Sequence, residues 1–173
     1  MIIRAYQGKV PKIHATAFIA DGVVIIGDVE IGELASIWYN CVLRADVGMI
    51  RIGRRSNVQD GSCLHMTSEL SHAIVGDEVT VGHNAIVHGA TVHDGALIGM
   101  GSILLDNAVI GTESLIAAGS VVPPRMVVPP YSMVRGQPAR VLREMNEHDR
   151  LEGRRGAAHY VDLAAEHAKL TEK

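Results

Sequence analysis

Aliphatic residues recur at every sixth position along most of this 173-residue chain, and this spacing limits the possible folds more than any other feature. A step of six fits neither the 3.6-residue period of a helix nor the alternation of a hairpin sheet. It fits a short strand followed by a tight corner, with one aliphatic side chain per step pointing inward. The residues form four runs: Ile19, Ile25, Ile31, Ile37 and Leu43; Ile52, Val58 and Leu64; Val75, Val81 and Val87; and Val92, Ile98, Leu104, Ile110, Ile116, Val122, Val128 and Val134.

Three such steps would close one coil of about 18 residues, and successive coils would stack as parallel strands about 4.8 Å apart. The composition agrees, because hydrophobic residues make up 47% of the chain and aromatic residues only 3%. A core with so little aromatic volume must be thin and regular. A β-sandwich of short strands would show alternation and hairpin turns such as Asn-Gly, and the sequence has neither. We therefore expect a parallel β-helix with a triangular cross-section.

Glycines and longer steps mark the corners and loops of this β-helix. The steps of nine and eleven residues between runs predict small loops near Val47–Ile50 and Thr67–Ala73. Glycine often follows the inward aliphatic residue, and we expect it at corners, where it tolerates a positive φ. The glycines in this position are Gly32, Gly53, Gly76, Gly82, Gly99 and Gly111.

The repeat fades in the proline-rich stretch VVPPRMVVPPYSMVRGQP, which suits the last coil or the exit from it. We expect residues 1–138 to form the β-helix and residues 139–173 to form a helical segment, both within one structural domain. Gly153 and Gly156 are expected to interrupt this segment. Its apolar side must be buried, and the flank of the β-helix is the available place.

Charge and cysteine content exclude several classes of function. The net charge of −3 gives no basic surface for nucleic acid or for a membrane. The first residues, MIIRAYQGKV, lack the apolar stretch of a secretory signal, and no run is long enough to span a membrane. We therefore expect a cytoplasmic protein in which Cys41 and Cys63 are reduced and serve as small packing residues.

His65, His83 and His88 each lie one or two positions after an aliphatic residue of the repeat, and they are the three of the nine histidines that the repeat groups together. His65 and His83 are 18 residues apart, so we expect them near one edge on adjacent coils, with His88 about one face further round. One chain would then not close a three-histidine site alone, whereas neighbouring chains could. Three imidazoles with an open fourth position are a catalytic zinc arrangement, in which the metal lowers the pKa of bound water to about 7. Spacing alone leaves solvated surface histidines as the alternative.

A second group of polar residues precedes these histidines. Arg44 and Asp46 lie two apart, so they share one face of a strand and can pair. Such a pair fits a structural role at a subunit interface better than a catalytic one. Asn57 and Gln59 also lie two apart and could hold a water or a small polar substrate near a metal. A stacked polar ladder on an exposed face is the alternative for all four residues.

The repeat and five short motifs resemble the gamma-class carbonic anhydrase family over nearly the whole chain, from about Ala15 onward. The motifs are R-A-D at 44–46, N-V-Q-D-G at 57–61, L-H at 64–65, G-H-N-A at 82–85 and V-H-G at 87–89. The resemblance implies a left-handed β-helix and a homotrimer with three metal sites at the subunit boundaries. It also implies that His65 and His88 of one subunit and His83 of its neighbour bind Zn²⁺, Fe²⁺ or Co²⁺.

The resemblance assigns roles to the other polar residues as well. Arg44 and Asp46 match the interface pair of the family, and Asn57 and Gln59 match its polar residues beside the metal. Gln59 would position the metal-bound water. Tyr160 matches an active-site tyrosine that the C-terminal helical segment brings in.

The implied activity is reversible hydration of CO2 to bicarbonate by metal-bound hydroxide. Two acidic features of the active family members are missing, because Val47 follows the R-A-D motif and the stretch MTSELSHAIVGDEV is too short for a loop with a proton-shuttling glutamate. Buffer, or a histidine such as His72, would have to export the proton. The alternatives are a CoA-dependent acyltransferase or thioesterase on the same scaffold, and a non-catalytic metal-binding trimer.

Overall fold

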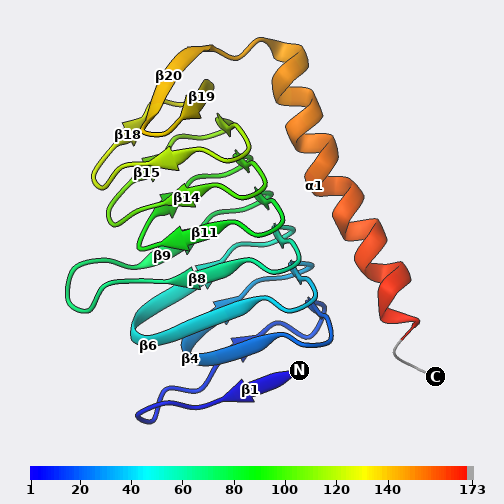
Figure 1. Ribbon diagram of the computed structural model, residues 1–173. Coiled ribbons are helices and arrows are strands. Elements are labelled where there is room, and N and C mark those ends of the chain that lie inside the picture. Colours follow the sequence, from blue (N-terminus) through cyan, green and yellow to red (C-terminus); the bar gives the residue numbers. More distant parts are fainter. Residues whose placement is uncertain (171–173) are drawn as a thin grey trace.

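The computed structural model describes residues 1–170, which form a three-sided solenoid of parallel strands with one helix along its side (Figure 1). This part of the chain makes about seven turns and then ends in the helix, α1 (Glu147–Ala168). The expected fold class is confirmed: the protein is mainly β, and its architecture is the left-handed parallel β-helix. No helix within residues 1–170 is long and apolar enough to cross a membrane.

Each side of the solenoid is a stack of short strands. The histidine face consists of β1 (Ile2–Arg4), the first parts of β4 (Val24–Ile31) and β6 (Val42–Ile52), β8 (Cys63–His65), β11 (Ile86–His88), β14 (Ile103–Leu104) and β17 (Val121–Val122). The second face consists of β2 (Lys12–Ile13), the later parts of β4 and β6, β9 (Ala73–Val75), β12 (Thr91–Val92), β15 (Val109–Ile110) and β18 (Val127–Val128). The helix face consists of β3 (Phe18–Ile19), β5 (Ser36–Ile37), β7 (Asn57–Val58), β10 (Thr80–Val81), β13 (Leu97–Ile98), β16 (Leu115–Ile116), β19 (Ser132–Gly136) and β20 (Ala139–Glu144).

The six-residue repeat forms the core, as the sequence predicts. On the histidine face, one inward column stacks in register from coil to coil, and all its members are fully buried: Ile25, Leu43, Leu64, Val87, Leu104 and Val122. Among the nineteen aliphatic residues of the repeat, only Ile19 is not in the buried class. Each coil therefore contributes the same small set of aliphatic side chains, and the core needs no aromatic filling.

The glycines that follow the inward residues serve a different purpose from the one expected. None of the six has a positive φ. Instead, a Cβ on Gly53 would lie 2.3 Å from the Gly76 carbonyl oxygen, and one on Gly111 would lie 2.4 Å from the Pro130 nitrogen of the next coil. The coils stack too closely there for any side chain. Positive φ angles occur at other positions, many of them non-glycine residues such as Asn84 and Asn107.

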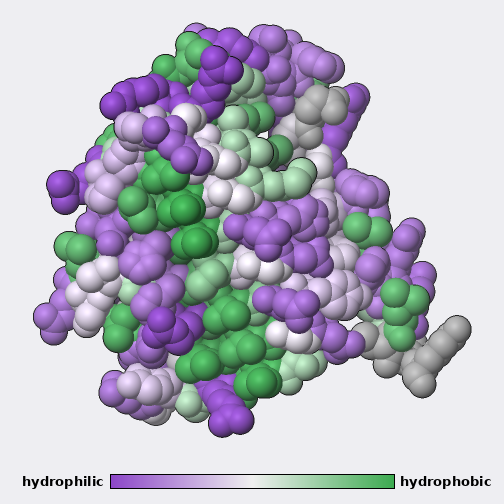
Figure 2. Space-filling model, viewed as in Figure 1, coloured by the Kyte–Doolittle hydropathy of each residue, from purple (hydrophilic) through white to green (hydrophobic). Residues whose placement is uncertain are grey.

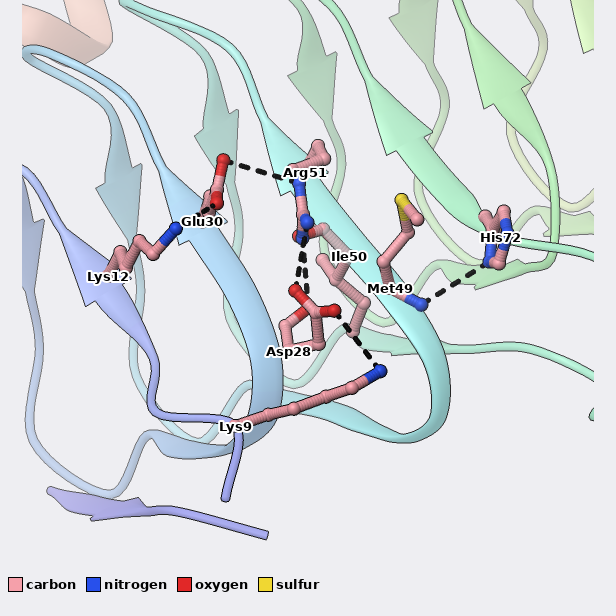
Figure 3. A network of polar contacts seen from close by, with 8 residues as sticks. All are labelled: Lys9, Lys12, Asp28, Glu30, Met49, Ile50, Arg51 and His72. Carbon is pink, nitrogen blue, oxygen red and sulfur yellow. Dashed lines mark hydrogen bonds and ion pairs between the residues drawn. The ribbon is translucent and has the colours of Figure 1, made fainter. Parts of the chain in front are cut away.

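One of the two expected loops is absent. Val47–Ile50 lies inside β6, which continues from the histidine face to the second face and pairs with β4 through a register shift between Gly27 and Val29. A bulge in the ladder thus accommodates the extra residues. The other loop exists, at residues 67–72 between β8 and β9. At the base of the second face, Arg51 contacts Asp28 at 2.8 Å and Glu30 at 3.3 Å in a network of ion pairs (Figure 3).

The C-terminal segment differs from the expected helix over residues 139–173. Ala139–Glu144 forms β20, which pairs antiparallel with β19, and the helix begins only at Glu147. Asn146 caps it, because its side chain accepts a hydrogen bond from the Asp149 backbone and the Asp149 side chain accepts one in return from the Asn146 backbone. The helix continues through Gly153 and Gly156, and residues 171–173 lie outside the described part.

The helix packs on the flank of the solenoid, as expected, in contact with β3, β5, β7 and β10. Most of the few aromatic residues gather beneath it. Trp38 packs against Phe18 and Tyr160, each with ring centroids 5.3 Å apart, and the Tyr39 hydroxyl lies 2.9 Å from Nδ1 of His167. Aromatic side chains thus attach the helix to the solenoid, whose interior is aliphatic.

Candidate functional site

His65 and His88 lie side by side on the histidine face. They are register partners on the adjacent strands β8 and β11, and their ring centroids are 5.4 Å apart. The expectation that His65 would stack with His83 is therefore wrong. The loop after β8 lengthens that coil, so the residue one coil above His65 is His88, while His83 lies in the corner after β10.

Each histidine of the pair contacts a carboxylate through one ring nitrogen. Nε2 of His65 lies 3.1 Å from Asp46 Oδ1, and Nδ1 of His88 lies 3.3 Å from Asp106 Oδ1. All four side chains are roughly three-quarters buried or more. A carboxylate on one nitrogen orients an imidazole and makes the opposite nitrogen a better metal ligand. For this pair the opposite atoms are Nδ1 of His65 and Nε2 of His88.

Arg44 completes one end of this arrangement. Its guanidinium donates to Asp46 Oδ2 at 2.5 Å, so the predicted Arg44–Asp46 pair forms within one chain. Burial raises the pKa of the Asp46 carboxyl, but hydrogen bonds from Arg44 and His65 outweigh it and leave the pKa below its usual value. Asp46 is therefore ionised at neutral pH and accepts from both neighbours.

His83 belongs to a second group of residues at another corner of the coil. Its Nδ1 lies 2.8 Å from Asp60 Oδ2. Tyr160 of α1 comes close to the same carboxylate: burial raises the pKa of the Tyr160 hydroxyl, and the charge of Asp60 raises it further. The helix thus brings Tyr160 to the His83 corner.

Asn57 and Gln59 form an oriented pair beside this corner. The Gln59 amide donates from Nε2 to Asn57 Oδ1 at 3.1 Å, and Asn57 donates from Nδ2 to Thr80 Oγ1 at 2.9 Å. Both side chains are buried. With its amide nitrogen engaged, Gln59 has its carbonyl oxygen Oε1 to offer to a water or a substrate. The chain therefore carries two partial sites, the His65–His88 pair and the His83 group.

The donor set of these two partial sites fits a divalent metal. Three imidazoles, each with a carboxylate near one ring nitrogen, match the ligand chemistry of catalytic zinc. Within residues 1–170, a single chain brings no three histidine, cysteine or carboxylate groups together for a metal. One chain thus places two of the candidate ligands, His65 and His88, together and the third, His83, elsewhere.

The histidine pair is bordered by an apolar ladder on the outside of the same face. Two of its members, Cys63 and Ile86, lie two positions before His65 and His88 on the same strands. The ladder members stack in register: Val24, Val42, Cys63, Ile86, Ile103 and Val121. Figure 2 shows hydrophobic side chains gathered in a band down this face. The free thiol of Cys63 is half-buried in the ladder, and the second free thiol, Cys41, is buried, so the expected reduced state agrees with the structure.

The carboxylates Asp60 and Asp106 were not singled out by sequence reasoning. Asp60 lies within the motif N-V-Q-D-G, so its place next to Gln59 was the available signal. Asp106 follows β14, 18 residues after His88, so the length of one nominal coil was the available signal for it. Only the stacking of coils brings it to that histidine.

The chain is similar to known proteins both in sequence and in fold. A family model described as "Bacterial transferase hexapeptide (six repeats)" matches residues 11–45 and 89–124. Carbonic anhydrase of Geobacillus kaustophilus is 50% identical over 161 residues, which are 93% of this chain and 88% of that protein. "Gamma carbonic anhydrase 1, mitochondrial" of Arabidopsis thaliana is 39% identical over 165 residues, 92% of this chain but 60% of the Arabidopsis protein.

A solved structure is similar over the whole fold. The hexapeptide transferase family protein of Anaplasma phagocytophilum has a TM-score of 0.91 and 40% sequence identity to this chain. The match covers 95% of this chain and 96% of that one.

Proposed function

The chain belongs to the gamma-class carbonic anhydrase family of hexapeptide-repeat proteins, and from this we propose that it is a metal-dependent lyase that hydrates CO2 to bicarbonate. The observation that carries the proposal is the His65–His88 pair, in which each imidazole has a carboxylate on one nitrogen and the opposite nitrogen left for a metal. His83 of a second subunit completes the ligand set.

The same geometry supports a homotrimer. The third ligand lies at a different corner of the coil from the pair, so one site needs two chains, and three chains in a ring complete three sites. The apolar ladder supports contact between subunits, because it places six aliphatic and thiol side chains on the outside of the face that carries the histidine pair. A partner packed on the ladder would exclude water from the site.

The bound metal, Zn²⁺ or alternatively Fe²⁺ or Co²⁺, would supply Lewis acidity and activate a water for attack on CO2. The protein residues have separate tasks. Gln59 orients the attacking water through Oε1, because its amide nitrogen is held by Asn57. Asp46 and Asp60 keep the rings of His65 and His83 in place, and Arg44 holds Asp46. The Tyr160 hydroxyl, with its raised pKa, stays protonated and donates to substrate oxygen.

The first experiment combines metal content with stopped-flow CO2 hydration. Protein purified without chelator should hold about one metal per chain and hydrate CO2. His83→Ala and His65→Ala should each lose metal and activity, whereas His93→Ala, at an exposed corner of the second face, should keep both. Because valine and not glutamate directly follows Asp46, the rate should rise with buffer concentration. Absence of hydration at full metal loading, including anaerobic iron loading, would contradict the proposal.

The shared site has a sharper test. When His65→Ala and His83→Ala chains are co-expressed, a boundary between one of each can contain all three histidines. In randomly mixed trimers, about one quarter of the boundaries have the right pairing. Metal binding should therefore return to about a quarter of the wild-type level, while a site built within one chain would stay empty.

A second candidate activity is acyl transfer from a CoA thioester, or hydrolysis of such a thioester. It is favoured by the family model named for transferases and by the similar transferase-family structure. In that case one of the carboxylate-bound histidines would act as a general base. Thioester turnover that persists after metal removal would support this candidate, and a metal-loaded trimer without either activity would indicate a binding protein.

A further inference from the structure

The carboxylate of Asp106 joins His88 to the loop Thr67–Ser71. Besides the 3.3 Å contact between Oδ1 and Nδ1 of His88, Oδ1 accepts a hydrogen bond of 2.5 Å from the Ser71 hydroxyl. Oδ2 accepts one of 2.9 Å from the Thr67 hydroxyl. Two hydroxyl donors from one loop and the imidazole of His88 thus converge on one carboxylate, whose side chain is only 20% exposed.

Thr67–Ser71 is a closed turn whose two ends both reach Asp106. The backbone N–H groups of Leu70 and Ser71 donate to the Thr67 carbonyl, and the Thr67 N–H donates to the Ser71 hydroxyl. The turn begins two residues after His65. Thr67, Ser71 and Asp106 together form what we call the clamp. It lies next to His65 along the chain and next to His88 in space.

Gly89 leaves the room that this clamp needs. Its φ is +63°, and a Cβ there would lie 2.1 Å from Ser71 Oγ and 2.3 Å from Asp106 Oδ1. Any other residue at the position would push the hydroxyl and the carboxylate away from each other. The glycine after His88 is thus explained by the passage of the Ser71–Asp106 contact beside it.

We propose that Asp106 is a positioning residue for His88, held in place by the hydroxyls of Thr67 and Ser71. The negative carboxylate 3.3 Å from Nδ1 favours a proton on that nitrogen, which leaves the Nε2 lone pair for the metal. The loop and Asp106 together fix the ring in the orientation that the pair with His65 requires. This inference rests on the proposed metal site for its purpose, but the clamp itself can be tested without metal.

The first test follows the tautomer of His88 in metal-free protein by long-range ¹H–¹⁵N correlation spectra. Wild type should show the proton on Nδ1. Asp106→Asn removes the negative charge beside Nδ1 and replaces one acceptor oxygen with an amide NH₂, so His88 should shift toward the Nε2-protonated form or exchange between the two. Ser71→Ala, which keeps the carboxylate but loosens it, should show a smaller shift in the same direction. An unchanged His88 tautomer in both variants would overturn the inference.

The second test measures zinc affinity by competition with a chromophoric chelator, and site geometry by the visible spectrum of the Co²⁺ form. Asp106→Asn should weaken zinc binding about 10- to 100-fold and alter the cobalt spectrum, and Ser71→Ala should have a smaller effect. The matched control is Asp94→Asn, which changes a corner carboxylate that accepts a backbone N–H from Asp77, and it should change neither readout. Circular dichroism and sedimentation confirm that the variants keep their fold and assembly.

The two readouts separate failure of this inference from failure of the proposed function. If wild type binds no metal, the proposed function fails, and the His88 tautomer still decides the role of Asp106. If wild type binds metal but Asp106→Asn binds zinc equally well with the same cobalt spectrum, Asp106 does not position His88.

Discussion

Asp28 joins neighbouring parts of the chain at the base of the solenoid through two ion pairs. It contacts Arg51 of β6 at 2.8 Å and Lys9 of the N-terminal segment at 3.3 Å, so it ties together two parts of the chain (Figure 3). Burial raises the pKa of the Asp28 carboxyl, but the contacts with Arg51 and Lys9 outweigh it and the net pKa is lowered. The bridge therefore stabilises the fold wherever Asp28 is ionised.

The pH dependence of Asp28→Asn tests this bridge. A carboxyl with a lowered folded pKa stabilises the protein above its unfolded pKa of about 3.9 and loses that contribution as pH falls through the folded value. At pH 7 the variant should be about 1 kcal/mol less stable than wild type, and the difference should close below about pH 4. Urea unfolding between pH 7 and 3 measures it, with the exposed Asp21→Asn as the control that should show no such gap.

Thiol reactivity makes a second prediction for individual residues. Burial raises the pKa of Cys41 to about 11, and its thiol donates to the Gln59 carbonyl at 3.0 Å. At pH 8 a disulfide reagent should therefore leave Cys41 unmodified in the native protein and modify it only after unfolding. Cys63→Ser provides the cleanest background, because Cys41 is then the sole thiol, and rapid labelling of the native variant would contradict the prediction.

Among the elements, the coils and the helix place opposite demands on glycine. Gly53 lies where its backbone packs against the Gly76 backbone of the next coil. Gly156 lies in α1, where a Cβ would have nothing within 4 Å. The same residue type thus permits close stacking in one element and only weakens the other. The capped, uninterrupted helix keeps its glycines because Asn146, the aromatic contacts and an ion pair of Arg154 with Glu113 hold it in place.

Alanine at the two positions should change stability in opposite directions. Gly53→Ala should destabilise the protein by about 1–3 kcal/mol, because the new Cβ meets backbone that cannot move without separating coils. Gly156→Ala should stabilise it by about 0.5–1 kcal/mol through helix propensity. Both follow from urea midpoints, and a neutral Gly53→Ala would show that the coils can separate at low cost.

In the whole molecule, the three faces of the solenoid carry different features. One side is covered by α1, one carries the charged network at its base, and one combines the apolar ladder with the histidine pair. In the proposed trimer, the ligands of one metal site come from two different corners of the coil, next to the apolar ladder. The site is therefore complete only when the subunits assemble.

Disrupting the ladder should separate subunits and abolish the metal site together. Ile86 is a ladder residue, 38% exposed, so Ile86→Lys should convert the trimer to monomers and lose bound metal while the coils stay folded. Val127 is 68% exposed on the second face, and Val127→Lys should keep both the trimer and the metal. Light scattering coupled to size exclusion, with metal analysis of each peak, measures the outcome. Equal behaviour of the two variants would exclude the histidine face as the interface.

The six-residue repeat was sufficient to predict the β-helix and its core, because each inward position repeats a local pattern of strand and corner that needs no knowledge of distant residues. The motifs around His65, His83 and His88 were likewise visible in the chain. The tertiary structure decided what depends on how coils stack. The loop after His65 changed which residues lie above one another, so His88 and not His83 became the partner of His65.

Which carboxylate contacts which histidine also depends on how the coils stack. Asp106 is 18 residues after His88, one nominal coil, and it reaches that histidine because the corner after β14 stacks on the corner after β11. β20 likewise became a strand because β19 offers it a free edge, although its own sequence is compatible with a helix. Periodicity is a local property of the chain, whereas register between coils is a property of packing, and the chemistry of this site depends on register.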